Sequence, residues 1–188
     1  MQLSLFPLSA HIFPGGKLSL RIFEPRYIRM VKESCQKGTG FGICMFNNKG
    51  DQTLNQHIFP IGTFVELVDF ETLSDGLLGI TVKGKSLFYV SNIDTQNDGL
   101  RVGECEFIPS LTLPLQGELT TNMAQRLRDL HQKYPEVGQC YDEVKYEEPL
   151  WVLYRWLELL PLSAVEKQEL IHPDNVHQAF DYLKGIVS

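Results

Sequence analysis

Hydrophobic and polar residues alternate along the first 110 residues of the chain, in short runs separated by turn signals. Apolar side chains on every second position are typical of strands that bury one face. The turns Ser74-Asp75-Gly76 and Asn97-Asp98-Gly99 carry the residues that tight turns between antiparallel strands require. The runs cover residues 18–22, 64–70, 77–82, 87–93 and 102–108. This pattern predicts an antiparallel β region that ends near residue 110.

Beyond residue 110 the apolar residues recur at helical spacing. Ser163 and Glu166 have the Ser-x-x-Glu spacing of a capping box, which predicts the start of a helix. A last helix is expected from about Pro173 to Leu183. The helical positions are Met123, Leu127, Leu130 and Tyr134, then Leu150, Leu153, Leu157 and Leu160. We therefore expect two domains, a β domain with one helix over residues 1–110 and a helical domain over residues 111–188.

The helix expected in the first domain begins at Pro25. Proline fixes φ near the helical value and lacks the N–H that the first helical turn would leave without a partner. Gly15-Gly16 provides the permissive backbone for the turn into the strand over residues 18–22. The order of these segments is thus a turn, a strand and a proline-initiated helix.

This order, with Glu24-Pro25-Arg26-Tyr27 at its centre, resembles the start of the Lon protease N-terminal substrate-binding domain. The similarity continues in order through residues 41–46, 61–67, 76–90 and 159–168. The chain departs from the family at Lys85-Ser86-Leu87, where Arg is common before Phe88, and at Gln178-Ala179, where Arg-Leu is usual. The resemblance implies an α+β fold, in which a PUA-like twisted antiparallel β pseudo-barrel is followed by a C-terminal helical bundle. It also implies a stand-alone domain without the ATPase and protease modules of Lon.

Charge and composition limit the kinds of partner. The chain has 188 residues, is 43% hydrophobic and carries a net charge of −6. Residues 1–109 contain ten Lys and Arg against eleven Asp and Glu, giving −1, and the remainder contains seven against twelve, giving −5. Nucleic-acid binding needs a basic surface, so we expect no nucleic-acid partner. The start of the chain lacks a signal-peptide pattern and no apolar run is long enough for a membrane span, so we expect a cytoplasmic protein without a membrane partner.

Motifs for catalysis, metals and cofactors are weak. Residues 79–86 match the phosphate-loop pattern G-x-x-x-x-G-K-[ST], but their alternation predicts a strand and the following residues also favour β structure, so no nucleotide is expected. His172 and His177 are five residues apart, a spacing that does not place two ligands on one helix face. Four widely spaced cysteines, Cys35, Cys44, Cys105 and Cys140, are expected to be buried free thiols. We expect no enzyme activity, no catalytic residues, no cofactor and no metal.

The family resemblance implies binding of unfolded or hydrophobic polypeptide. The candidate contact residues are Phe6, Pro7, Leu8, Ile12, Phe13, Pro14, Glu24 and Arg26. The apolar members could instead pack the mouth of the barrel, and an extended polypeptide could also add to an exposed strand edge. A role as adaptor to a protease or chaperone is left open. The alternative function is that of an RNA-binding PUA-like module.

Overall fold

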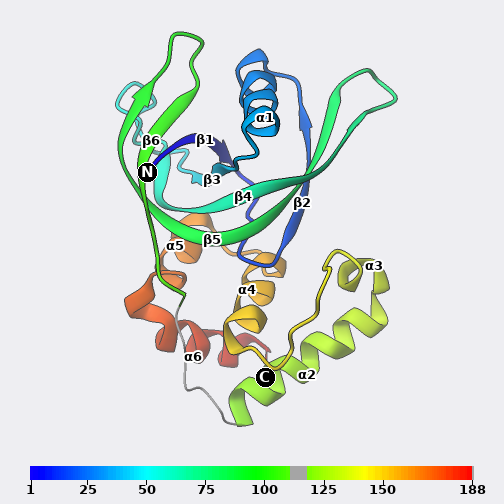
Figure 1. The fold of residues 1–188 in the computed structure, drawn as a ribbon. Coiled ribbons are helices and arrows are strands. Elements are labelled where there is room, and N and C mark those ends of the chain that lie inside the picture. The colour runs from blue at the N-terminus through cyan, green and yellow to red at the C-terminus, as the bar shows by residue number, and fades with distance from the viewer. Residues whose placement is uncertain (111–117, 188) are drawn as a thin grey trace. The chain divides into compact units, whose positions relative to one another are not determined.

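The computed structural model describes residues 1–110 and 118–187, in two compact units, Met1–Ile108 and Pro109–Ser188 (Figure 1). Residue 111, the predicted start of the helical domain, lies outside the described residues. The first unit consists of β1 (Gln2–Leu8), β2 (Lys17–Ile22), α1 (Pro25–Lys37), β3 (Phe41–Phe46), β4 (Ile58–Thr72), β5 (Leu78–Thr95) and β6 (Arg101–Phe107). Pro25 is the first helical residue of α1, as the sequence predicts.

The six strands form one sheet that closes into a barrel. Their order is β2-β5-β4-β3-β1-β6, and β6 also pairs with β5, so that β5, β4, β3, β1 and β6 make a closed ring. The β1–β3 pair is parallel, with Leu5 opposite Gly42, whereas the sequence predicts only antiparallel neighbours. The difference arises because β2 and α1 lie between these two strands in the chain and allow the crossover that a parallel pair needs.

Strand β5 is a single element of 18 residues, although its apolar positions predict two separate runs. Its first part pairs with β2 and its second part with β6, while β4 follows its other side. The phosphate-loop pattern at residues 79–86 lies within this strand, and Lys85 forms an ion pair with Glu66 of β4 at 3.0 Å. A phosphate loop requires a helix after the glycine-rich turn, and here the strand simply continues.

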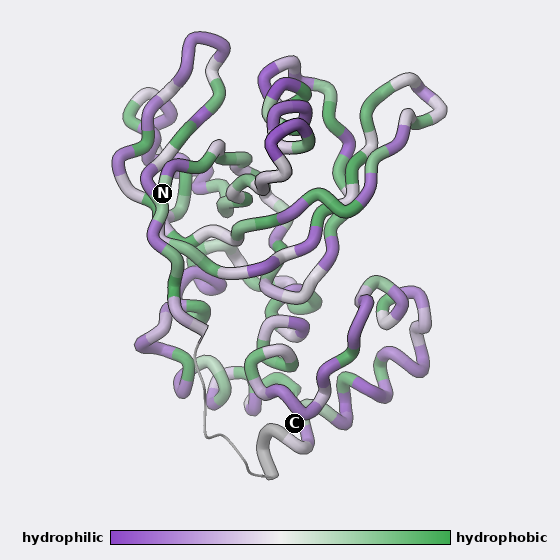
Figure 2. The backbone as a smooth tube through the Cα atoms, in the orientation of Figure 1, coloured by the Kyte–Doolittle hydropathy of each residue, from purple (hydrophilic) through white to green (hydrophobic). Residues whose placement is uncertain are grey.

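Hydrophobic and hydrophilic residues alternate along the strands (Figure 2). The buried hydrophobic side chains form the core of the barrel. Phe88 is completely buried beside Leu5 and Cys44. A Cβ atom built on Gly42 or Gly62 would lie 2.6 or 2.5 Å from the tip of the Phe88 ring, so the two glycines leave the space that this ring occupies. A second apolar cluster joins α1 to the strands through Tyr27, Met30 and Val31.

The second unit is helical. Its elements are α2 (Glu118–Lys133), α3 (Pro135–Gly138), α4 (Pro149–Leu159), α5 (Ala164–Leu170), η1 (Pro173–Asn175) and α6 (Val176–Val187). The last helix predicted from Pro173 therefore begins with a 3₁₀ turn and becomes α-helical only at Val176. Trp156 donates a hydrogen bond from its indole N–H to the carbonyl of Met123, which ties α4 to α2 within the core of this unit.

The predicted capping box at the start of α5 is present. The Ser163 hydroxyl accepts a hydrogen bond from the Glu166 N–H, and the Glu166 carboxylate accepts one from the Ser163 N–H. Replacing Ser163 with alanine should lower the free energy of unfolding of the helical unit by about 1 kcal/mol, because one helical N–H loses its acceptor. Urea denaturation followed by tryptophan fluorescence would measure the loss, and an unchanged midpoint would show that the cap is dispensable.

The cysteines divide into two classes. Cys44 and Cys105 are buried, whereas Cys35 and Cys140 are exposed, so the prediction of four buried thiols is wrong for two of them. Cys35 lies on the solvent side of α1, and Cys140 follows the short helix α3. None of the helices in the described part of the chain has the length and apolar character needed to cross a membrane.

Candidate functional site

A cavity of about 360 Å³ opens at the end of the barrel where β1 and β3 end and β4 and β6 begin. Its wall combines apolar side chains with several cationic ones. The lining residues are Phe6, Pro7, Leu8, Leu20, Arg21, Ile22, Phe23, Glu24, Arg26, Tyr27, Phe46, Gln52, His57 and Arg101. We call this cavity the barrel-end pocket. It brings together segments from five strands or their ends and the first turn of α1.

Five of the eight candidate contact residues line the barrel-end pocket, namely Phe6, Pro7, Leu8, Glu24 and Arg26. Phe6 is 7% exposed and stacks on Tyr27 with ring centroids 4.0 Å apart, so it forms part of the pocket floor. The other three, Ile12, Phe13 and Pro14, are not among the lining residues. Ile12 and Phe13 are 3% and 1% exposed, which assigns their side chains to the core.

Nine of the lining residues were not candidates from the sequence, and three of them, Phe23, His57 and Arg101, matter most for the chemistry of the pocket. Phe23 lies between β2 and α1 and is 66% exposed, an unusual position for a large aromatic side chain. His57 precedes β4 and Arg101 begins β6, so both are far from α1 in sequence. The Phe23-Glu24-Pro25 segment could have signalled the aromatic residue, but no local pattern marks the other two.

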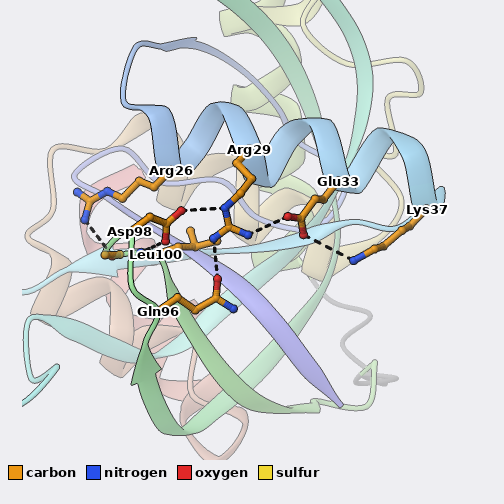
Figure 3. A network of polar contacts seen from close by, with 8 residues as sticks. Arg26, Arg29, Glu33, Lys37, Gln96, Asp98 and Leu100 are labelled. Carbon is orange, nitrogen blue, oxygen red and sulfur yellow. Dashed lines mark hydrogen bonds and ion pairs between the residues drawn. The ribbon is translucent and has the colours of Figure 1, made fainter.

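The β5–β6 turn is clamped to α1 by arginine side chains, which positions one wall of the pocket (Figure 3). Arg29 donates hydrogen bonds to the Asp98 carboxylate at 2.8 Å, to Glu33 at 2.8 Å and to the Gln96 side chain at 2.6 Å. The hydrogen bond from Arg29, and after it the one from the Leu100 N–H, hold the pKa of Asp98 below its ordinary value. One turn earlier on the helix, Arg26 donates to the Gly99 carbonyl at 3.0 Å.

Two pocket arginines, Arg26 and Arg101, share the carbonyl of Gly99 as a hydrogen-bond acceptor. Its φ of 85° lies in the left-handed region, and its carbonyl accepts hydrogen bonds from Arg26 and, at 2.6 Å, from Arg101. Arg101 also donates from Nε to the Asn55 side chain at 3.0 Å. The left-handed turn thus fixes both guanidinium groups against the pocket.

The pocket has an electropositive interior in a protein of negative net charge. Arg26 is paired with Glu24, and its guanidinium lies 4.8 Å from the centre of the Tyr27 ring. Burial lowers the pKa of His57, and the nearby Arg101 and Arg26 charges lower it further. Burial raises the pKa of Tyr27, an effect that Arg26 opposes. At neutral pH the imidazole and the phenol are therefore both uncharged.

The strand β2 offers an open edge beside the pocket. It pairs with β5 on one side, and no other strand of the described residues pairs with it. Leu20, Arg21 and Ile22 of this strand line the pocket, so the edge and the cavity are continuous. An extended peptide could add its backbone to such an edge.

The described part of the chain offers little for nucleophilic or metal chemistry. Burial raises the pKa of the Cys44 thiol far above its ordinary value and that of Cys105 to about 11, so neither is a thiolate at neutral pH. Residues 1–110 and 118–187 contain no cluster of three or more His, Cys, Asp and Glu side chains that could hold a metal ion. A larger cavity of about 510 Å³ lies near Met1 and the C-terminal end of α1, where Phe41, Phe64, Lys37 and two glutamates are among its lining residues.

Residues 2–185 match the family model described as the ATP-dependent protease La (LON) substrate-binding domain. The chain belongs to the Lon substrate-binding domain family. The Lon N-terminal domain protein from Xanthomonas campestris has a similar crystal structure, with a TM-score of 0.75 and 27% identity over 100% of this chain and 99% of that one. The family and the α+β class with a twisted barrel and following helices are thereby confirmed.

Two further proteins are similar to this chain. The N-terminal domain of a Lon protease from the Mycobacterium avium complex has a TM-score of 0.70 at 12% identity, over 97% of this chain and 96% of that one, and shows the fold alone. Protein cereblon from Gallus gallus is 26% identical over 137 residues. That match covers 69% of this chain and 28% of cereblon, so the chain spans well under a third of that relative. Membership of the Lon family supports a role in substrate recognition in general.

Proposed function

We propose that the barrel-end pocket binds unfolded or hydrophobic polypeptide segments without changing them chemically. The observation that carries the proposal is Phe23, a large aromatic side chain that is 66% exposed at a cavity whose wall is partly apolar. A solvent-exposed aromatic residue beside a concave apolar surface is typical of recognition sites. The family model, named for substrate binding, supports the same role.

A bound segment would use two features of the site together. The open edge of β2 offers backbone hydrogen bonds, which give affinity without demanding a particular sequence. The cavity, lined by Pro7, Leu8 and Phe46, accepts an apolar side chain of that segment. We further propose that segments held in this way pass to a protease or chaperone carried by another chain. A polypeptide is a better fit than RNA, because the net charge of −6 opposes a phosphate backbone.

Replacing Phe23 with aspartate should weaken the binding of an unfolded peptide about tenfold, because the rim loses its apolar contact. Fluorescence anisotropy with a labelled synthetic peptide rich in Leu and Phe would measure the affinity. Phe70→Asp is the matched control, since Phe70 is 64% exposed, lies in β4 and does not line the barrel-end pocket. An equal loss of peptide affinity in the two variants, or no loss of affinity in Phe23→Asp, would contradict the proposed site.

A further inference from the structure

We propose that the barrel-end pocket recognises a carboxylate on the bound polypeptide, held by Arg101 beside the apolar contact. The inference rests on the proposed function and names the chemical class of polypeptide that this site prefers. A chain's C-terminal carboxylate and an Asp or Glu side chain present the same group, so either could supply it.

The charges of the pocket leave one cation without an anionic partner. Three arginines and one glutamate line the cavity. Arg21 is paired with Asp75, and Arg26 is paired with Glu24. The contacts of Arg101 within the described residues are with neutral oxygens, the Asn55 side chain and the Gly99 carbonyl. An arginine held by two neutral acceptors keeps its full positive charge for a ligand, and its planar fork suits a carboxylate.

Two polar atoms on the pocket wall are also buried without a hydrogen-bond partner. They are Nε of Arg26 and Nδ1 of His57, and the His57 residue is only 5% exposed. Buried polar groups are almost always satisfied in native proteins, so these two atoms on the cavity wall are available to a polar group of a ligand. Arg26 Nε is a donor, and His57 Nδ1 becomes one when the imidazole is protonated. Both could then donate hydrogen bonds to an acceptor such as a carboxylate.

The N-terminus of α1 also favours an anion in the pocket. The helix has 13 residues, no side chain caps its N-terminus, and the N-cap residue Glu24 and the first-turn residues Arg26 and Tyr27 line the pocket. The N-terminus of the helix, the positive end of its dipole, therefore lies beside the cavity, where it favours an anion. With one uncompensated arginine charge, a carboxylate monoanion matches the site better than a phosphate dianion, which would also approach Glu24.

A bound carboxylate should change the protonation of His57. The groups that act on this ring are Arg101 of β6, Arg26 of α1 and the Asp51 backbone. Glu24 and Arg21 are the other charged residues that line the pocket. Arg101 and Arg26 disfavour the imidazolium in the free protein, and an anion between them offsets both. Binding then raises the pKa of His57 and takes up a proton, so affinity for the carboxylate increases as pH falls.

The test uses the full chain and three labelled peptides of about ten residues. The peptides are built from Leu, Phe, Ser and Gly and differ only at one internal residue and at the C-terminal group. The first has a free carboxyl terminus and an internal Gln, the second a terminal amide and an internal Glu, and the third a terminal amide and an internal Gln. We expect at least one carboxylate peptide to bind about tenfold more tightly than the neutral third peptide. Which of the two does so distinguishes a terminal from a side-chain carboxylate.

Arg101→Met should abolish this preference, whereas Arg101→Lys should keep part of it. Arg128→Met, an arginine of α2 outside the pocket, is the control and should keep all of it. The gain in affinity at pH 6 should disappear in His57→Gln. Equal binding of all three peptides would overturn the carboxylate preference and leave the proposed function standing, and no binding of any peptide would overturn both. Displacement of the carboxylate peptides by inorganic phosphate, but not by acetate at equal concentration, would assign the pocket to phosphate instead and overturn the inference.

Discussion

Replacing Glu158 with leucine should lower the free energy of unfolding of the helical unit by about 3–5 kcal/mol. Arg155 is completely buried in α4, and its Nε lies 2.9 Å from the Glu158 carboxylate. Its guanidinium also lies 4.8 Å from the centre of the Tyr141 ring and 5.3 Å from that of Trp151. Removing the carboxylate leaves a cation in the core with its main counter-charge gone, which costs far more than losing a surface ion pair.

Both tryptophans of the chain, Trp151 and Trp156, belong to α4, so their fluorescence during urea denaturation reports on the helical unit alone. The matched control is Glu147→Leu, which removes the exposed partner of Arg128 and should change stability little. The double variant Arg155→Met with Glu158→Leu should recover much of the loss, because the buried guanidinium is then removed together with its partner. A loss in Glu158→Leu no larger than that in Glu147→Leu would show that Arg155 does not depend on this carboxylate.

Replacing Phe88 with alanine should lower the free energy of unfolding of the barrel unit by about 3–5 kcal/mol, because the ring is fully buried between the glycines of β3 and β4. The converse change, Gly62→Ala, should also destabilise strongly, since the added Cβ would lie 2.5 Å from the ring and 2.9 Å from the Ile43 carbonyl.

Combining Gly62→Ala with Phe88→Leu should cost less than the sum of the two single changes, because the smaller side chain makes room for the methyl group. Denaturation followed by far-ultraviolet circular dichroism records the unfolding of both units, and tryptophan fluorescence, which reports on the helical unit alone, identifies the part of the signal that belongs to the barrel. If the two changes in the free energy of unfolding simply add, the Phe88 ring and a methyl group at position 62 do not compete for the same space.

Much of the fold follows from local patterns in the sequence. Pro25 marks the first residue of α1, Ser163 and Glu166 form the capping box, and glycines at positive φ occupy the turns at Gly76 and Gly99. The parallel β1–β3 pair was not predictable, because strand pairing depends on the crossover through β2 and α1 and not on either strand alone. The continuity of β5 was also missed, since Gly84 interrupts the apolar alternation without ending the strand.

The candidate site was predictable only where its residues are neighbours in the chain. Phe6, Pro7, Leu8, Glu24 and Arg26 belong to two short segments that also carry the family resemblance. His57 and Arg101 reach the same cavity through barrel closure, which brings the starts of β4 and β6 to the ends of β1 and β3. Ile12 and Phe13 were candidates because they are apolar and beside prolines, but residue type alone does not separate a core contact from a surface one.

The account depends most on the barrel-end pocket being where a polypeptide lies. Nuclear magnetic resonance spectra of the ¹⁵N-labelled full chain, recorded during titration with the neutral unfolded peptide, test this directly. The backbone amide signals of Leu8, Phe23, Arg26 and Arg101 should shift together and saturate at one affinity. Saturable shifts confined to other parts of the chain, with these four signals unmoved, would contradict it.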